Sequence, residues 1–126
     1  MAQTLINLGL IRSAHSKVDP KGALNVAAVT DCLTSLWGRS WKAWTHMSDS
    51  EPTLVIEVPA SVSHATLHRL AQTFDQDAVA AFDFAKGEGK LAGPSAALWG
   101  PFNPAYFIIP GGARLSEHLE LVSNAA

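Results

Sequence analysis

The chain has 126 residues, of which 48% are hydrophobic and 16% charged, a balance typical of one compact domain, 1–126, that can bury its own core. Nine basic and eleven acidic residues give a net charge of -2, and the basic residues are scattered along the chain. Nucleic acids and anionic membrane surfaces attract clustered positive charge, so we expect neither as a partner.

The cellular location is predicted from cysteine usage and from the N-terminus. Cys32 is the only cysteine, which excludes an internal disulfide, and its apolar helical surroundings predict an unreactive thiol. The first residues lack the basic start and the apolar run of a signal peptide. No stretch approaches the roughly 20 apolar residues of a membrane-spanning helix. We therefore expect a protein of the reducing cytoplasm.

The first half of the chain predicts a strand followed by a helix. Residues 3–11 are dominated by apolar side chains and predict the strand. Asp19 and Pro20 are favourable at the cap and at the first position of a helix, and Gly38 is typical of a helix end. We expect a helix between these points, with an apolar face made of Val26, Val29, Leu33, Leu36 and Trp37.

The middle of the chain predicts a hairpin. Residues 39–47 alternate bulky and polar side chains, which is the period of a half-buried strand. Residues 48–52 have the composition of a turn, and 53–58 predict a second strand. One face of that second strand is apolar and consists of Leu54, Ile56 and Val58.

A second helix and several short elements follow. Ser61 or Ser63 is expected to cap the helix, whose apolar stripe consists of Leu67, Leu70, Ala71 and Phe74. Glycines at 87 and 89 predict a hairpin turn over 86–90, between strands at 78–82 and 91–92. The remaining elements that we expect are a last strand at 106–109 and one or two amphipathic helical turns over 115–122.

This order predicts an α+β fold in which two helices cover one face of an antiparallel sheet. The plan is ferredoxin-like, βαββαβ, with one or two added strands and a C-terminal extension from about Gly93. Four tryptophans are too many to lie beneath the helices. We therefore expect exposed aromatic side chains on the other sheet face, which indicates self-association or a ligand.

The search for catalytic and metal motifs leaves few candidates. His64 and His68 share one face of the second helix, but no third ligand is evident, so no metal site or cofactor is predicted. No nucleophile elbow or phosphate-binding loop occurs. His15 and His46 lie beside polar loops. Either histidine, paired with a carboxylate, could act as an acid or base, so a small enzyme is the alternative.

The segment 98–107 is the best candidate for recognition, because it combines four aromatics with two prolines that stiffen the loop. Its rings could stack on a planar ligand, an asparagine could read the ligand's edge, and arginines could bind phosphate. Alternatively the rings pack the extension onto the sheet, the asparagine is a turn residue and the arginines are solvated. The candidate ligand-binding residues are Arg69, Trp99, Phe102, Asn103, Tyr106 and Arg114.

A family resemblance sharpens this candidate. The segments 51–57, 70–71, 76–80, 93–94 and 99–107 resemble phage anti-defence proteins that counter the Thoeris system by sequestering cyclic ADP-ribose-type signals. Some relatives in that group also sequester cyclic oligonucleotides. The resemblance covers about residues 51–114 and implies a homo-oligomer with pockets between subunits and no catalysis. The ligand contacts that it implies are Phe102, Asn103, Arg69 and Arg114.

Three functional hypotheses therefore stand at the level of sequence. The first is a cytoplasmic, non-catalytic protein that sequesters a small cyclic nucleotide-derived immune signal. The second is a small enzyme on a ferredoxin-like scaffold. The third is an interaction module that docks its aromatic face on another protein.

Overall fold

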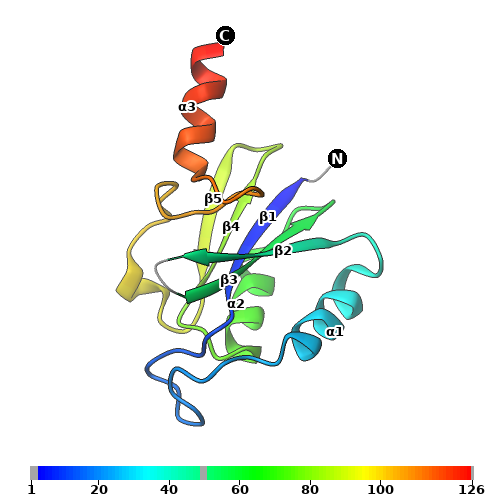
Figure 1. The fold of residues 1–126 in the computed structure, drawn as a ribbon, viewed down its shortest axis with the longest axis vertical. Coiled ribbons are helices and arrows are strands. Elements are labelled where there is room, and N and C mark those ends of the chain that lie inside the picture. Colours follow the sequence, from blue (N-terminus) through cyan, green and yellow to red (C-terminus); the bar gives the residue numbers. More distant parts are fainter. Residues whose placement is uncertain (1–2, 49–50, 126) are drawn as a thin grey trace.

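Five antiparallel strands form one sheet in the computed structural model, which describes residues 3–48 and 51–125. Across the sheet the order is β2-β3-β1-β4-β5 (Figure 1). The strands are β1 (Thr4–Gly9), β2 (Lys42–Ser48), β3 (Glu51–Val58), β4 (Val79–Asp83) and β5 (Glu88–Ala92). The helical elements are α1 (Val26–Trp37), α2 (His64–Thr73), α3 (Leu115–Ala125) and the 3-10 turn η1 (Ala96–Trp99).

The α+β class, the antiparallel sheet and both hairpins, β2–β3 and β4–β5, agree with the prediction. The turn of the second hairpin lies earlier than the predicted 86–90, because residues 88–90 pair with β4 as part of β5. The strand order of the whole sheet is not the simple βαββαβ arrangement of ferredoxin-like proteins, because β5 extends the sheet beyond β4. Pro52 lies inside β3 rather than in the predicted turn, and residues 49–50 of that turn lie outside the described residues.

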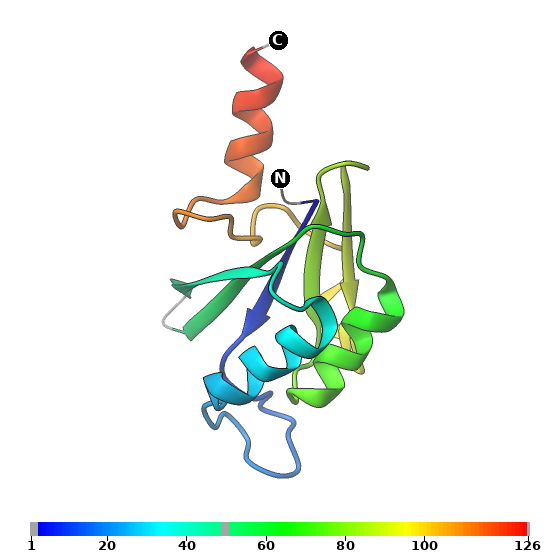
Figure 2. The same cartoon turned by 90° about the vertical axis from the view of Figure 1, so that its right-hand side faces the viewer.

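Helices α1 and α2 cover one face of the sheet and form the main core with it (Figure 2). Alternate residues of β1 and β3 point into this core, as the strand period requires. On β3 they are the three residues that the sequence predicts on one face, Leu54, Ile56 and Val58. The helices contribute Val29, Leu33, Leu67, Leu70 and Ala71.

The opposite face, here called the open face, is covered only in part. Residues 93–114, here called the C-terminal arm, cross it and bring Phe107 and Ile108 onto Leu5, Val55 and Phe82. The arm then leads into α3, which begins at the buried Leu115 and projects away from the sheet (Figure 1). Helix α3 has 11 residues, more than the one or two turns predicted. None of the described helices combines the length and apolar character needed to cross a bilayer.

The predicted strand at 106–109 is wrong, because a side chain takes the place of a strand ladder there. Only Ile108 forms an isolated bridge, to Arg114. The Asn7 amide of β1 instead donates to the Ile108 carbonyl at 2.9 Å and accepts from the Ile108 amide at 2.8 Å. This pair of hydrogen bonds fastens the C-terminal arm to the open face.

The predicted start of the first helix at Asp19–Pro20 is also wrong. Lys21 has φ +59°, a left-handed conformation that interrupts a right-handed helix. The helix starts after Asn25, whose Oδ1 accepts from the Ala27 amide at 2.9 Å and caps α1. Its end at Gly38, with φ +62°, is confirmed, and so is the Ser63 cap of α2.

Candidate functional site

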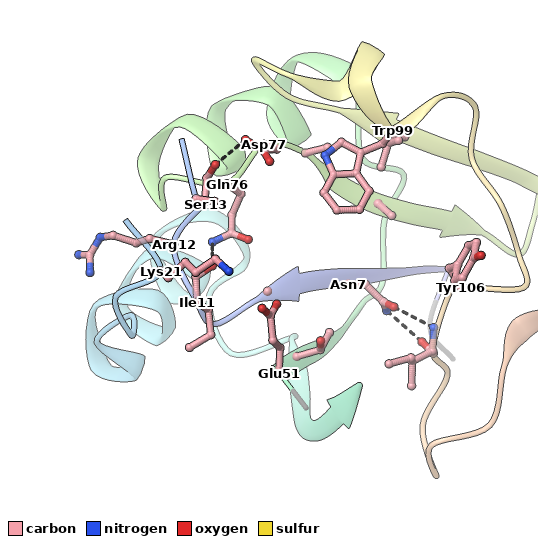
Figure 3. Close-up of a pocket in the computed structure, with 17 residues that line it drawn as sticks. Asn7, Ile11, Arg12, Ser13, Lys21, Glu51, Gln76, Asp77, Trp99 and Tyr106 are labelled. Atoms are coloured by element: carbon pink, nitrogen blue, oxygen red, sulfur yellow. Dashed lines mark hydrogen bonds between the residues drawn. The ribbon is translucent and has the colours of Figure 1, made fainter. Parts of the chain in front are cut away.

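A cleft lies on the open face, between the C-terminal arm and the loop 12–21 (Figure 3). Two adjoining hollows, of about 370 and 910 Å³, share much of their lining and form one continuous cleft. Four strands build its floor, because side chains that point away from the helices reach the open face. The floor residues are Asn7, Gly9, Thr53, Ala80 and Leu91.

One end of the cleft is aromatic. Trp99 and Tyr106 both line it, and 66% and 72% of their surfaces are exposed. Hydrogen bonds fasten the backbone near both residues. The Ser95 amide before η1 donates to the Asp77 carbonyl at 2.9 Å, and the Tyr106 carbonyl accepts from Arg114 Nη1 at 3.2 Å. Two exposed rings on a fastened segment are typical of a stacking site rather than of a core.

The other predicted contacts of the arm are engaged within the chain. Phe102 packs on Phe82 and Phe107, with ring centroids 6.0 and 5.4 Å apart, and it fills the space where a Cβ on Gly89 would lie. Asn103 Oδ1 accepts from the Ala105 amide at 2.9 Å, as a turn residue does. Phe102 and Asn103 line the outer hollow, but these contacts support the packing alternative for both residues.

The two predicted arginines lie in different places. Arg114 lines the outer hollow close to Tyr106. Arg69 is exposed on α2, on the helix-covered side of the sheet, and lines neither hollow. The structure therefore brings five of the predicted residues together and leaves Arg69 out. The five are Trp99, Phe102, Asn103, Tyr106 and Arg114.

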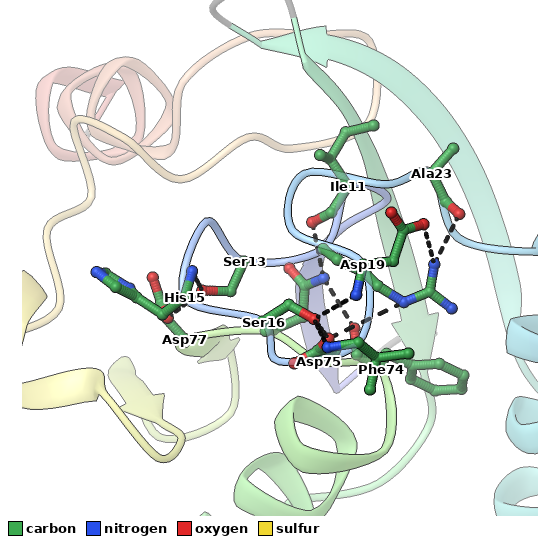
Figure 4. Close-up of polar contacts among 12 residues, drawn as sticks. Ile11, Ser13, His15, Ser16, Asp19, Ala23, Phe74, Asp75 and Asp77 are labelled. Carbon is green, nitrogen blue, oxygen red and sulfur yellow. Dashed lines mark hydrogen bonds and ion pairs between the residues drawn. The ribbon is translucent and has the colours of Figure 1, made fainter.

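The opposite end of the cleft is polar and was not predicted as part of a site. Ser13, Lys21 and Asp77 line it, with Glu51 on the β3 side (Figure 3). The Ser13 hydroxyl donates to the Asp77 carboxylate, and His15 Nδ1 lies 3.4 Å from the same Oδ1 atom (Figure 4). Asp77 thus joins the loop 12–21 to the segment before β4.

A second set of contacts keeps the loop 12–21 in place. The buried Ser16 hydroxyl donates to the Asp75 carboxylate and accepts from the Val18 and Asp19 amides, both at 3.1 Å. The Ser13 amide donates to the Asp75 carbonyl at 2.8 Å. The two contacts with Asp75 join positions about sixty residues apart, which no local pattern of the sequence signals. Asn7, a lone amide within an apolar strand, is a sequence signal for the floor of this cleft.

The remaining candidates do not add to the cleft. Within residues 3–48 and 51–125, no three His, Cys, Asp or Glu side chains are grouped so that they could hold a metal ion. Cys32 packs against the helix-side core, and burial raises the pKa of its thiol, which keeps it protonated and weakly reactive at neutral pH. Of the tryptophans, Trp37 and Trp41 pack against that core, whereas Trp44 is 38% exposed.

No protein-family model, curated protein or solved structure matches the chain. The resemblance to anti-Thoeris proteins therefore stays a prediction.

Proposed function

We propose that the protein captures a small molecule with a planar ring in the open-face cleft and does not convert it. The supporting observation is the contrast among the arm's aromatics. Phe107 is buried and Phe102 is packed, whereas Trp99 and Tyr106 stay two-thirds exposed at the mouth of the cleft. Leaving two large rings in water forgoes hydrophobic stabilisation, which a stacked ligand would restore.

A nucleotide derivative is the ligand class that suits this cleft best. A base would stack at the aromatic end, and Arg114 could contact a phosphate there. Arg12 already pairs with Asp19 and Asp75, at 3.6 and 4.0 Å, which leaves Lys21 for an anionic group at the polar end. Glu51 and Asp77 would disfavour a ligand with several phosphates close to them.

The biological role we propose is sequestration of a cyclic nucleotide-derived immune signal in a host cytoplasm. The anti-Thoeris resemblance implies this role, and capture alone would suffice for it. Shape and stacking in a largely preformed cleft would supply affinity without catalytic groups. Relative to the sequence-based proposal, Trp99 and Tyr106 replace Phe102 and Asn103 as the central contacts.

Calorimetric titration with a fixed panel tests this proposal: cyclic ADP-ribose, ADP-ribose, NAD and a cyclic dinucleotide. We expect at least one of them to bind the wild-type protein, and Trp99→Ala to weaken that binding at least tenfold. Trp44→Ala is the matched control, because Trp44 is also partly exposed but does not line the cleft. Equal losses in both variants, or no binding of any panel member, would contradict the proposal.

A small enzyme is the second candidate, and one observation favours it. His15 Nδ1 lies 3.4 Å from Asp77, which lines the polar end, so the carboxylate could fix the ring with Nε2 free to act as a base. The Ser13 hydroxyl donates to Asp77 rather than to His15, so no serine nucleophile is activated. Recovery of a chemically altered ligand, abolished in His15→Ala, would select this candidate over capture.

His46 is a poorer base than His15. Its Nε2 atom is buried without a hydrogen-bond partner among the described residues, and its ring lies beside Gly112 of the arm. A base must reach the proton that it removes. His46 therefore belongs to the packing of the arm on β2.

A further inference from the structure

The two edges of the sheet differ in how well they are protected from pairing with a further strand. At one edge β5 is short, carries Glu88 and Lys90, and contains Gly89. Lys90 Nζ also donates to the Val62 carbonyl at 2.9 Å, which ties this edge to the segment before α2. Charged residues and short length are features by which proteins keep sheet edges from pairing.

At the other edge β2 lacks these features. It has seven residues, no proline, and a single charged residue, Lys42, at its first position. It pairs with β3 on one side, and no described strand lies on its other side (Figure 1). Apart from the β2–β3 ladder, no backbone hydrogen bond between described residues involves 42–47. The outer backbone groups of β2 are therefore available to a further strand.

From this we infer that the outer edge of β2 pairs antiparallel with β2 of a second copy, centred on Thr45. In that register the sequence of β2 is complementary to itself. Thr45 faces Thr45 of the second copy, Trp44 faces His46, and Ala43 faces Met47. Each pair joins side chains of the same kind on one sheet face, and such cross-strand pairs stabilise a sheet. Lys42 is the single charged residue of β2 and does not face its own copy in this register, so no like charges meet.

The exposed side chains of β2 also fit a second copy. Met47 is 68% exposed and Trp44 38%, and both would gain contacts across the boundary. A second copy is favoured over a foreign peptide for two reasons. The side chains of β2 pair with those of an antiparallel copy, and β2 has a single charged residue, so it presents no charge pattern that would select a different peptide. No residue of β2 lines the cleft, so this inference does not depend on the proposed ligand.

A charge swap at the centre of the strand tests the register, with light scattering after size exclusion as the readout. We expect the wild-type protein to have twice the monomer mass at about 100 µM. Thr45→Lys and Thr45→Glu should each be monomeric, because like charges would face each other at the centre. An equimolar mixture of the two variants should regain the dimer mass.

Two controls separate the loss of β2 pairing from an effect of added charge or of misfolding. Ser35→Lys adds the same charge on the exposed face of α1 and should stay dimeric. Circular dichroism of each variant should match the wild type, since Thr45 is exposed. A monomeric wild-type protein would overturn the proposal. An extended peptide would then be the better candidate to pair with the outer edge of β2. A dimeric Thr45→Lys variant, or a mixture that stays monomeric, would overturn it too.

Discussion

The two faces of the sheet are built by different means. On the helix-covered face, regular strands and helices bury a continuous set of aliphatic side chains. On the open face, an irregular arm buries a smaller cluster and is fastened by the Asn7 amide. The first arrangement stabilises the fold. The second leaves a cleft beside two exposed rings, so stability and recognition are assigned to opposite faces.

The strongest test of this division is a cavity in the helix-side core. Leu67 is fully buried between α2 and the sheet, so Leu67→Ala should lower the free energy of unfolding by about 3 kcal/mol. Urea denaturation followed by circular dichroism measures the loss. A loss below about 1 kcal/mol would contradict the assignment of stability to this face.

Removal of the arm's fastening should have a smaller and more local effect. Asn7→Ala leaves the amide and carbonyl of Ile108 without their partners, which should cost about 2 kcal/mol. Hydrogen exchange should then accelerate in the arm and not in α2. Asn25→Ala is the control, because it removes the cap of α1, costs about 1 kcal/mol and should leave exchange in the arm unchanged. Uniform acceleration across the protein would argue against a separate arm.

Asp83 links acid stability to the helix-covered face. Burial alone would raise the pKa of Asp83, but hydrogen bonds from the Ser61 hydroxyl, the Lys86 and Ala85 amides and Gln3 outweigh it and lower the pKa below 3.8. The ionised carboxylate therefore stabilises the fold above about pH 4. This contribution is lost as the pH falls through 3.8 toward the lower pKa of the folded state.

Urea midpoints measured from pH 6 to pH 2 check this dependence. The wild-type midpoint should fall faster below pH 4 than that of Asp83→Asn, which lacks the titrating group. Asp31→Asn is the control, because Asp31 is exposed on α1 and its replacement should leave the wild-type slope unchanged. Parallel curves for the wild type and Asp83→Asn would contradict the role of Asp83.

The smallest effect on stability is expected at the exposed rings. Trp99→Ala and Tyr106→Ala should each change the free energy of unfolding by less than about 0.5 kcal/mol, because both side chains are mostly in water. The same urea denaturation measures this change. A loss above about 2 kcal/mol in either variant would mean that the ring belongs to the fold rather than to a site.

The helix-covered face could be predicted because its signals are local. The alternation in β3 and the Ser63 cap are read from neighbouring residues, and both agree with the structure. The predicted start of the first helix is wrong because Asp19 and Asn25 are both good caps. The choice between them depends on the turn at Lys21, which only the folded loop reveals.

The open face could be predicted only in part because its contacts are distant in sequence. The exposure of Trp99 and Tyr106 suits the predicted aromatic segment. The polar end joins Ser13 to Asp77 through tertiary contacts that leave no periodic pattern. The charge of Arg69 indicates a phosphate contact, but the fold places this residue on the other side of the sheet.

Native mass spectrometry of protein purified from cells that make cyclic ADP-ribose-type signals tests the central claim most directly. The wild-type protein should carry a small molecule that heat releases intact, and a Trp99→Ala/Tyr106→Ala double variant, folded by circular dichroism, should carry none. Equal retention by both proteins, a wild-type protein without ligand, or a ligand released in altered form would contradict capture in the open-face cleft.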